Sequence, residues 1–260
     1  MNILDTIVAQ KRKEVEQRSI ATPVSVLEQQ IHFTRPVYSL VNFLAANTRT
    51  GIIAEYKRKS PSKGMINADA TVEEVTKAYA EHASGISVLT DTEFFGGSTA
   101  DLEKARFNKV PILRKDFMID EYQVYEAKAM GADIILLIAA CLTVQQVNEL
   151  GACAKGLGLE VLLEIHNQEE LAHISDMVDM VGVNNRNLKT FEVDIRTSLE
   201  LIGHIPAGKP AIAESGISNV DTIVTLRNAG FSGFLIGENF MKEPVPSIAF
   251  ADFVHQLKAS

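Results

Sequence analysis

The sequence predicts a (β/α)8 TIM barrel of the α/β class, preceded by an N-terminal helical extension. One kind of unit recurs eight times: a short run rich in β-branched residues or leucine, a polar or glycine-containing turn, and an amphipathic helical stretch. The intervals between successive runs are long enough for a crossover helix. A length of 260 residues also suits one such barrel.

The repeating units place the elements as follows. Strands are expected at residues 52–57, 86–89, 111–114, 134–138, 160–163, 180–183, 211–213 and 233–236. Helices are expected at residues 72–83, 99–107, 121–130, 143–155, 169–174, 194–202, 219–228 and 245–257. Eight units in a row favour closure into a barrel, and residues 57–64 lack the GxGxxG pattern that an open dinucleotide-binding sheet needs after its first strand.

The first strand begins near residue 51, so the chain is interpreted as a single domain, residues 1–260, with a helical extension over 1–48 and the barrel over 49–260. Apolar residues from Ile3 to Val15 recur at helical spacing, and a second amphipathic piece covers 24–31. Three placements of this extension remain open. It plugs the bottom of the barrel, packs against the side, or forms a flap over the mouth.

Composition excludes several classes of function. The net charge of -8 and the isoelectric point near 5.3 argue against binding nucleic acid or an anionic membrane, because both require basic patches. We expect the two cysteines, Cys141 and Cys153, to be reduced. No apolar run is long enough for a signal peptide or a membrane span, so the cytoplasm is the expected compartment. Nothing fixes the oligomeric state, and a monomer is the simplest expectation.

Charged side chains follow several of the predicted strands at the end where barrel active sites lie. Glu55 and Lys57 end the first strand and project to the same face, Lys115 ends the third, and Glu164 lies in the fifth. A barrel interior is normally apolar, so such charges are costly unless they pair or act. We therefore expect Lys57, Lys115 and Glu164 to be catalytic rather than a purely structural ion network. By contrast, the neighbouring loop charges Arg58, Lys59 and Lys63 are expected to be solvated.

Two glycine-containing turns predict an anion site. Ser215 and Gly216 precede the seventh helix, and Gly237 and Glu238 follow the eighth strand. Backbone N–H groups in such turns converge on anions, and phosphate sites after strands seven and eight recur in this fold.

A metal site is not expected. The six histidines are scattered without ligand spacing, and each is interpreted as a surface or helix residue: His32, His82, His166, His173, His204 and His255. Cys141 is interpreted as a small core residue rather than a nucleophile, because no histidine or second acid accompanies it in sequence.

Together these motifs resemble the indole-3-glycerol-phosphate synthase family of tryptophan biosynthesis. The resemblance runs in order from about residue 50 to 240, and its motifs are Glu55-Tyr56-Lys57-Arg58-Lys59-Ser60-Pro61-Ser62, Leu89-Thr90-Asp91, Phe94-Phe95-Gly96-Gly97-Ser98, Leu113-Arg114-Lys115-Asp116-Phe117, Leu163-Glu164, Asn184-Asn185-Arg186-Asn187-Leu188 and Glu214-Ser215-Gly216-Ile217. It implies a carboxy-lyase without metal or cofactor. The implied substrate is 1-(2-carboxyphenylamino)-1-deoxyribulose 5-phosphate, which would be converted to indole-3-glycerol phosphate, carbon dioxide and water.

The chemistry of that reaction suits the residues. Attack of an aromatic carbon on a ketone needs a cationic acid to protonate the developing alkoxide, and Lys115 can supply it. Loss of the hydroxyl then needs an acid, for which the resemblance proposes Lys57 or Lys115, and a base, Glu164. The choice between the two lysines stays open. Neighbouring carboxylates raise the pKa of a lysine and neighbouring cations lower it, and we expect one lysine to be tuned toward neutrality.

The remaining site residues have supporting roles in the resemblance. Glu55 orients a lysine, Asn184 bonds the polar core of the substrate, and Arg186 supports the carboxylate side. The phosphate is expected on Ser60 and on the backbone of Gly216, Gly237 and Glu238, and the aromatic ring against Phe117 and Leu188. Glu214, Ser215 and Leu235 complete the substrate-binding set. Some relatives close the aromatic side of the pocket with a tryptophan from the extension, and this chain has none.

Two other functions compete with the synthase. A phosphate-binding barrel of the class I aldolase type would use Lys115 as a Schiff-base nucleophile, and a non-catalytic phosphometabolite-binding protein would need no acid or base. Phosphoribosylanthranilate isomerase would require a cysteine at the end of the first strand, where this chain has Glu55-Tyr56-Lys57.

Overall fold

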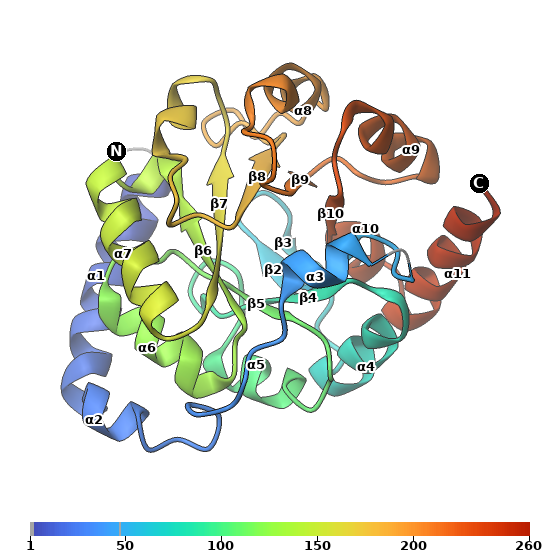
Figure 1. Ribbon diagram of the computed structural model, residues 1–260. Helices are drawn as coiled ribbons and strands as arrows, with labels where there is room; N and C mark the ends of the chain where they lie inside the picture. The colour runs from blue at the N-terminus through green and yellow to red at the C-terminus, as the bar shows by residue number, and fades with distance from the viewer. Residues whose placement is uncertain (1–2, 47) are drawn as a thin grey trace.

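The computed structural model describes residues 3–46 and 48–260 and contains a closed barrel of eight parallel strands (Figure 1). Residues 1, 2 and 47 of the predicted extension lie outside the described residues. The barrel strands are β1 (Ile52–Tyr56), β4 (Gly85–Leu89), β5 (Ile112–Lys115), β6 (Ile134–Ile138), β7 (Glu160–Ile165), β8 (Met180–Asn184), β9 (Ala211–Glu214) and β10 (Gly233–Ile236). Strand β10 pairs with β1 and closes the cylinder, so the predicted fold is confirmed.

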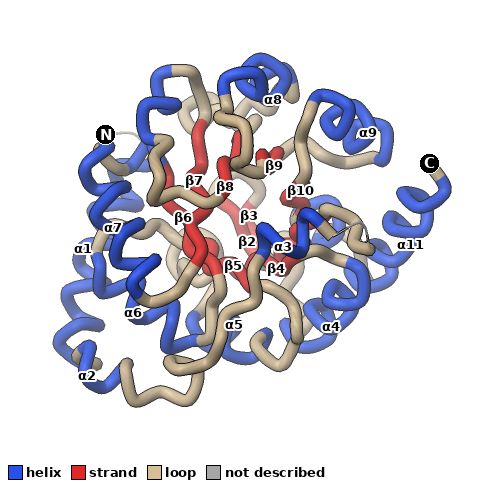
Figure 2. The backbone as a smooth tube through the Cα atoms, in the orientation of Figure 1, coloured by secondary structure: helices blue, strands red, loops and turns tan. Residues whose placement is uncertain are grey.

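Helices surround the strands on the outside (Figure 2). They are α4 (Val72–His82), α5 (Thr99–Ala105), α6 (Glu121–Met130), α7 (Val144–Gly156), α8 (Arg196–Leu201), α9 (Val220–Ala229), α10 (Glu238–Met241) and α11 (Pro246–Ala259), with the 3-10 turns η1 (Ala139–Cys141), η2 (Glu169–His173) and η3 (Ile202–His204). The prediction of an α-helix at 169–174 is wrong, because η2 is a short 3-10 turn. There the Glu170 side chain accepts hydrogen bonds from the His166 backbone and from Asn167, which fixes a tight turn.

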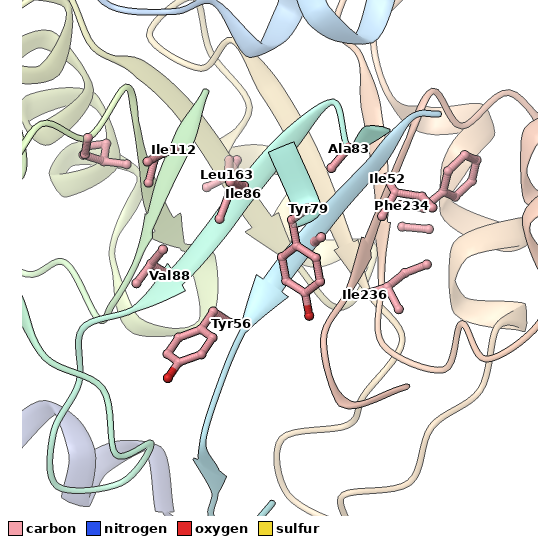
Figure 3. Packing of buried hydrophobic residues seen from close by; sticks show 14 of the residues in the cluster. Ile52, Tyr56, Tyr79, Ala83, Ile86, Val88, Ile112, Leu163, Phe234 and Ile236 are labelled. Carbon is pink, nitrogen blue, oxygen red and sulfur yellow. The ribbon is translucent and has the colours of Figure 1, made fainter. Parts of the chain in front are cut away.

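Alternation along each strand separates two hydrophobic layers. Residues such as Ile52, Val88 and Ile236 point outward and pack beneath the helices, where Tyr79 of α4 is fully buried (Figure 3). A second buried cluster fills the barrel interior: Leu40, Ile53, Leu113, Ile134, Leu136, Ile138, Leu162, Met180, Ile212 and Leu235. Because the side-chain period of a strand is two, the residue two positions after Ile53, Leu113, Leu162 or Ile212 also faces inward. Those positions are Glu55, Lys115, Glu164 and Glu214, and they form the polar end of the interior.

The N-terminal extension satisfies all three placements that the sequence left open. Helix α1 (Ile3–Ala21) and the short α2 (Val24–Leu27) pack against the outside of α6. Helix α3 (Leu40–Ala45) closes the bottom of the barrel, where the backbone N–H of Leu40 donates to Glu160 at the start of β7 (2.7 Å). The first residues of α1 reach the mouth and line its cavity. The extension therefore packs against the side of the barrel, closes its bottom and lines its mouth.

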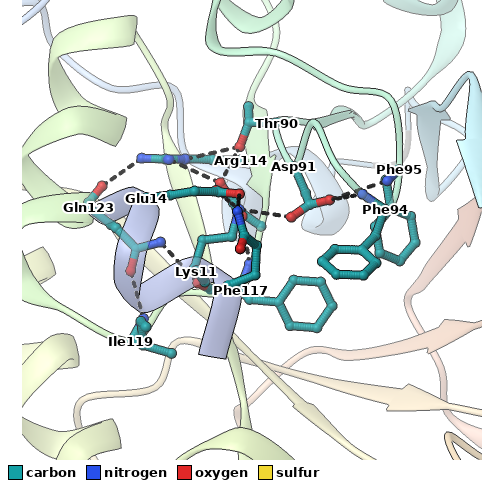
Figure 4. A network of polar contacts seen from close by, with 12 residues as sticks. Lys11, Glu14, Thr90, Asp91, Phe94, Phe95, Arg114, Phe117, Ile119 and Gln123 are labelled. Carbon is teal, nitrogen blue, oxygen red and sulfur yellow. Dashed lines mark hydrogen bonds and ion pairs between the residues drawn. The ribbon is translucent and has the colours of Figure 1, made fainter. Parts of the chain in front are cut away.

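A buried ion network connects α1 to the barrel (Figure 4). The Lys11 Nζ lies 2.8 Å from Asp91 Oδ2 and 3.0 Å from Asp116 Oδ1, and the side chain is only 1% exposed. Arg114, also fully buried, contacts the other oxygen of Asp116 at 3.0 Å and Glu126 of α6 at 3.2 Å. Asp116 follows β5 directly and Asp91 lies two residues after the end of β4, so one lysine links the extension to two strand ends at the mouth.

The loop after β1 contains a small hairpin, β2 (Lys59–Ser60) paired with β3 (Gly64–Met65). Arg58 at its base makes two hydrogen bonds of 2.7 Å to Asp101 and lies over the ring of Tyr56. The expectation that Arg58 is a solvated loop charge is therefore wrong, since its partner comes from α5. Lys63 is 58% exposed, as expected for a loop charge.

Candidate active site

The predicted site residues lie together at the C-terminal end of the barrel. One cavity at the mouth is lined by Glu55, Lys57, Ser60, Lys115, Phe117, Glu164, Asn184, Arg186, Leu188, Glu214, Ser215, Leu235 and Glu238. A second cavity beside it is lined by Gly216 and Gly237 as well as by Ser215 and Glu238. Side chains from separate strands thus meet at one rim, as the barrel topology requires.

Lys115 occupies the centre of a carboxylate cluster. Its Nζ lies 2.7 Å from Glu164 Oε2 and 3.3 Å from Glu214 Oε2, and its side chain is 14% exposed. Gly182 on β8 makes room for Glu214, because a Cβ at that position would lie 2.3 Å from Glu214 Oε1. The ammonium therefore has two close acceptors and still faces the cavity.

Burial and charge set the protonation states of this cluster. Burial would lower the pKa of Lys115, but the carboxylates of Glu164, Glu214 and Glu55 outweigh it and raise this pKa above its ordinary value. Burial would likewise raise the pKa of Glu164, but Lys115 and His166 hold it well below the usual range. For Glu214, burial and the charge of Glu164 outweigh Lys115 and raise the pKa to about 8. Lys115 is thus an ammonium and Glu164 a carboxylate at neutral pH, and the expectation of a lysine tuned toward neutrality is wrong for Lys115.

Asn184 is held in one orientation by its neighbours. Its Nδ2 donates to Glu164 Oε1 at 3.0 Å, while its Oδ1 accepts from the Ser215 hydroxyl at 2.9 Å. Ser215 has a φ of 66° and is followed by Gly216 with a φ of 78°. A left-handed conformation is uncommon for a non-glycine residue, so this turn stores backbone strain at the point where Ser215 reaches Asn184.

Lys57 extends into the cavity from the end of β1. Its Nζ pairs with Glu55 Oε1 at 2.7 Å, in agreement with the expectation that Glu55 holds a lysine. Gly237 packs directly against this pair, since a Cβ there would lie 2.6 Å from Glu55 Oε1. The turn after β10 therefore needs glycine for its close approach to Glu55.

An apolar wall faces the charged groups. Phe117 lies 5.9 Å from Phe95, between ring centroids, and both line the mouth cavity with Leu188. The sequence prediction missed Phe95, Phe191 and three residues of α1 that line the same cavity, Ile3, Leu4 and Ile7. The helical spacing of the α1 residues was visible in the sequence. Their position at the mouth depends on how α1 packs, which no local pattern gives.

His166 is a further residue that sequence reasoning missed. It was interpreted as a surface or helix residue, and that interpretation is wrong, because its side chain is 10% exposed and contacts two acids. Its Nε2 lies 3.2 Å from Glu164 Oε1, and its Nδ1 lies 3.2 Å from Glu170 Oε2. A usable signal was present, since His166 is two residues after Glu164 and so emerges on the same side of the chain.

Other groups in the described part of the chain carry less chemistry. Burial raises the pKa of the Cys141 thiol to about 12, as expected for a core residue rather than a nucleophile. Within residues 3–46 and 48–260, no three side chains of His, Cys, Asp or Glu are grouped so that they could hold a metal ion. None of the helices in these residues is long and apolar enough to cross a bilayer.

Comparison with known proteins identifies the family. The family described as "Indole-3-glycerol phosphate synthase" matches residues 4–252. The chain belongs to the indole-3-glycerol phosphate synthase family. A relative named indole-3-glycerol phosphate synthase from Bacteroides thetaiotaomicron is 48% identical over 99% of both chains. Another synthase, from a Polaromonas species, is 44% identical over 96% of this chain and 97% of its own.

Solved structures resemble this synthase-family chain more distantly. A mutant tryptophan synthase α-subunit from Pyrococcus furiosus is 18% identical, with a TM-score of 0.62 over 82% of this chain and 99% of its own. A chain of the tryptophan synthase a2b2 complex from the same organism gives a TM-score of 0.63 at 17% identity, over 82% of this chain and 99% of its own. Similarity at this level supports the barrel fold that the synthase family shares with these proteins.

Proposed function

We propose that this chain catalyses the formation of indole-3-glycerol phosphate from 1-(2-carboxyphenylamino)-1-deoxyribulose 5-phosphate. The observation that carries the proposal is the buried 2.7 Å pair of Lys115 and Glu164, which places a cationic acid and an anionic base side by side at the mouth. Ring closure and dehydration need both groups, because one oxygen must gain protons and one carbon must lose a proton.

The steps assign a role to each residue. The ring carbon that bears the carboxylate attacks the ketone carbon, and the Lys115 ammonium protonates the alkoxide that forms. Loss of carbon dioxide returns the electron pair to the ring. Glu164 then removes a proton from the carbon next to nitrogen, while the hydroxyl leaves as water with a proton from Lys57, or from Lys115 after solvent has reprotonated it. Glu55 keeps Lys57 oriented, and Asn184 bonds the polar core of the substrate.

The substrate fits the two sides of the cavity. We place the aromatic ring against Phe117, Leu188 and Leu235, with Arg186 near its carboxylate. The phosphate lies in the second cavity, on the backbone of Gly216, Gly237 and Glu238, beside Ser60. Within the described residues the buried Ser60 Oγ has no hydrogen-bond partner, and a buried hydroxyl without a partner is costly unless a ligand satisfies it.

The direct test is incubation of the purified chain with this substrate, with the fluorescent indole product as the readout. Product formation at a rate proportional to enzyme supports the proposal, and its absence under conditions where the chain is folded refutes it. An aldolase of the class I type is less well supported, because a raised pKa keeps Lys115 protonated and a protonated amine cannot form a Schiff base. Borohydride with substrate should therefore trap no covalent adduct. The absence of a required metal or cofactor, the cytoplasmic location and the monomeric state remain predictions.

Ser60→Ala should raise KM by roughly 10- to 100-fold with little change in kcat, because a hydrogen bond to a charged group is worth roughly 1.5–3 kcal/mol and the phosphate lies away from the reacting atoms. Steady-state kinetics over a range of substrate concentrations measure both constants. Ser232→Ala, at the opposite end of the barrel, is the matched control and should leave KM unchanged. An unchanged KM in Ser60→Ala would remove this serine from the phosphate site.

A further inference from the structure

We propose that His166 is a positioning residue for this reaction, an imidazolium that bridges Glu164 and Glu170 and keeps the base Glu164 anionic and oriented. The proposal rests on the proposed function, since it concerns the acid that we assign as the base. It adds a cation beside Glu164 to a site whose acid–base chemistry the two lysines would otherwise explain.

The geometry fixes the protonation of His166. Glu170 Oε2 accepts a hydrogen bond of 2.7 Å from the His166 backbone N–H and lies 3.2 Å from the Nδ1 of the ring. A carboxylate can only accept, so Nδ1 must carry a proton. Nε2 faces Glu164 Oε1 at 3.2 Å. A neutral ring with its proton on Nδ1 would leave an unprotonated Nε2 3.2 Å from that carboxylate oxygen, so the arrangement favours protons on both nitrogens.

The surroundings of His166 agree with this charge. Burial would lower its pKa, but Glu164 and Glu170 outweigh burial and raise the pKa to about 9. His166 and Glu170 line a third cavity, to which the loop after β8 contributes Arg186 and Lys189 together with Glu192 and Asp194. The cations of that loop are therefore matched by acids. The two acids in contact with the ring therefore dominate.

His166 completes the restraint of Glu164. Lys115 holds Oε2 at 2.7 Å, and Oε1 lies 3.0 Å from the Asn184 amide and 3.2 Å from His166. The Nε2 contact is an ion pair without hydrogen-bond alignment in the described structure, so its effect on Glu164 is mainly electrostatic. Because Lys115 also serves as an acid and gives up its proton during turnover, His166 is the cation that stays beside Glu164 throughout.

The test is the pH dependence of kcat in His166→Gln, which keeps a donor near the position of Nε2 and removes the charge. Losing a cation in contact with Glu164 should raise the pKa of this carboxyl by about 1 unit or more. As the pH is lowered, the variant would then lose activity at a higher pH than the parent enzyme does. We expect the acid limb of the kcat profile to move up by about 1 pH unit or more, with kcat at the optimum about tenfold lower and KM within about threefold of the parent.

A matched control is available on the same turn. His173 is also partly buried, but its two nitrogens contact no acid among the described residues and instead face the backbone oxygens of Glu170 (3.1 Å) and Leu142 (3.0 Å). His173→Gln tests whether a change in this turn alone shifts the acid limb of the kcat profile, and we expect the acid limb of this variant to match that of the parent. Glu170→Gln leaves His166 in place but removes one of the two acids that raise its pKa. The acid limb of Glu170→Gln should therefore move in the same direction as that of His166→Gln, by a smaller amount. This variant also covers the case in which His166→Gln does not fold.

Two outcomes would overturn the proposal. One is an unshifted acid limb in folded His166→Gln, or in Glu170→Gln where His166→Gln does not fold. The other is a neutral His166 ring at pH 7 by NMR of the ring nitrogens in the parent enzyme. The NMR measurement needs no turnover, so it separates this proposal from the proposed function. A parent enzyme that forms no product while its His166 is charged would refute the activity and leave the bridge intact.

Discussion

Lys115→Met should lower kcat by roughly 10²–10⁴-fold, the range for loss of a positioned general acid, with the chain still folded. Methionine retains much of the apolar stem and removes the ammonium that lies within 3.3 Å of both Glu164 and Glu214. The alkoxide formed on ring closure would then lack its proton donor. Steady-state kinetics with the fluorescent product measure the loss.

A suitable control for Lys115→Met is Lys109→Met, which removes an exposed lysine just before β5, at the opposite end of the barrel. It should retain the parent kcat within about twofold, because exposed charges far from a site are screened. A Lys115→Met enzyme within tenfold of the parent would contradict the assignment of Lys115. The binding-protein alternative would be favoured only if the parent itself formed no product.

The barrel could be predicted because its pattern is local. Each strand is a short apolar run with a period of two, and that period places Glu55, Lys115, Glu164 and Glu214 on the inner face with the apolar interior. Closure into a cylinder then brings these residues to one rim. The residues at the ends of the predicted strands were therefore sufficient to predict the charged side of the site.

The features that were missed depend on contacts between distant segments. Phe95 and the first turn of α1 reach the cavity only through loop and helix packing. The expectation that one lysine is tuned toward neutrality was wrong for Lys115 for the same reason, because three carboxylates from three other strands raise its pKa. His166 differs, since Glu164 and Glu170 are close to it in sequence. It was missed because the histidines were searched only for metal-ligand spacing.

Lys11 is the clearest case of a residue whose burial no local pattern could show. It lies on a helix with a charged sequence, between the partly exposed Gln10 and the exposed Arg12. Its partners Asp91 and Asp116 come from the ends of two barrel strands. Burial would lower its pKa, but these two acids outweigh burial and raise it. Lys11 is therefore charged in the folded state at neutral pH.

Lys11→Met should reduce the free energy of unfolding by about 3–5 kcal/mol, the cost of removing one partner from a buried ion pair. Asp91 and Asp116 would remain buried, with Arg114 in contact with Asp116 alone. Urea unfolding, followed by circular dichroism, should show a midpoint lowered by about 1 M or more. The exposed Lys13 on the same helix gives the control Lys13→Met, whose midpoint should stay within the error of the parent.

The same variant separates two roles of the extension. If α1 only stabilises the barrel, folded Lys11→Met should keep the parent KM at temperatures well below its midpoint. If Lys11 also fixes the mouth, KM should rise severalfold, because Asp116 adjoins Lys115 and the N-terminal end of α1 lines the cavity. We expect the second result, since the lysine joins α1 to the ends of both β4 and β5. A midpoint equal to that of Lys13→Met would show that the buried network contributes nothing to stability.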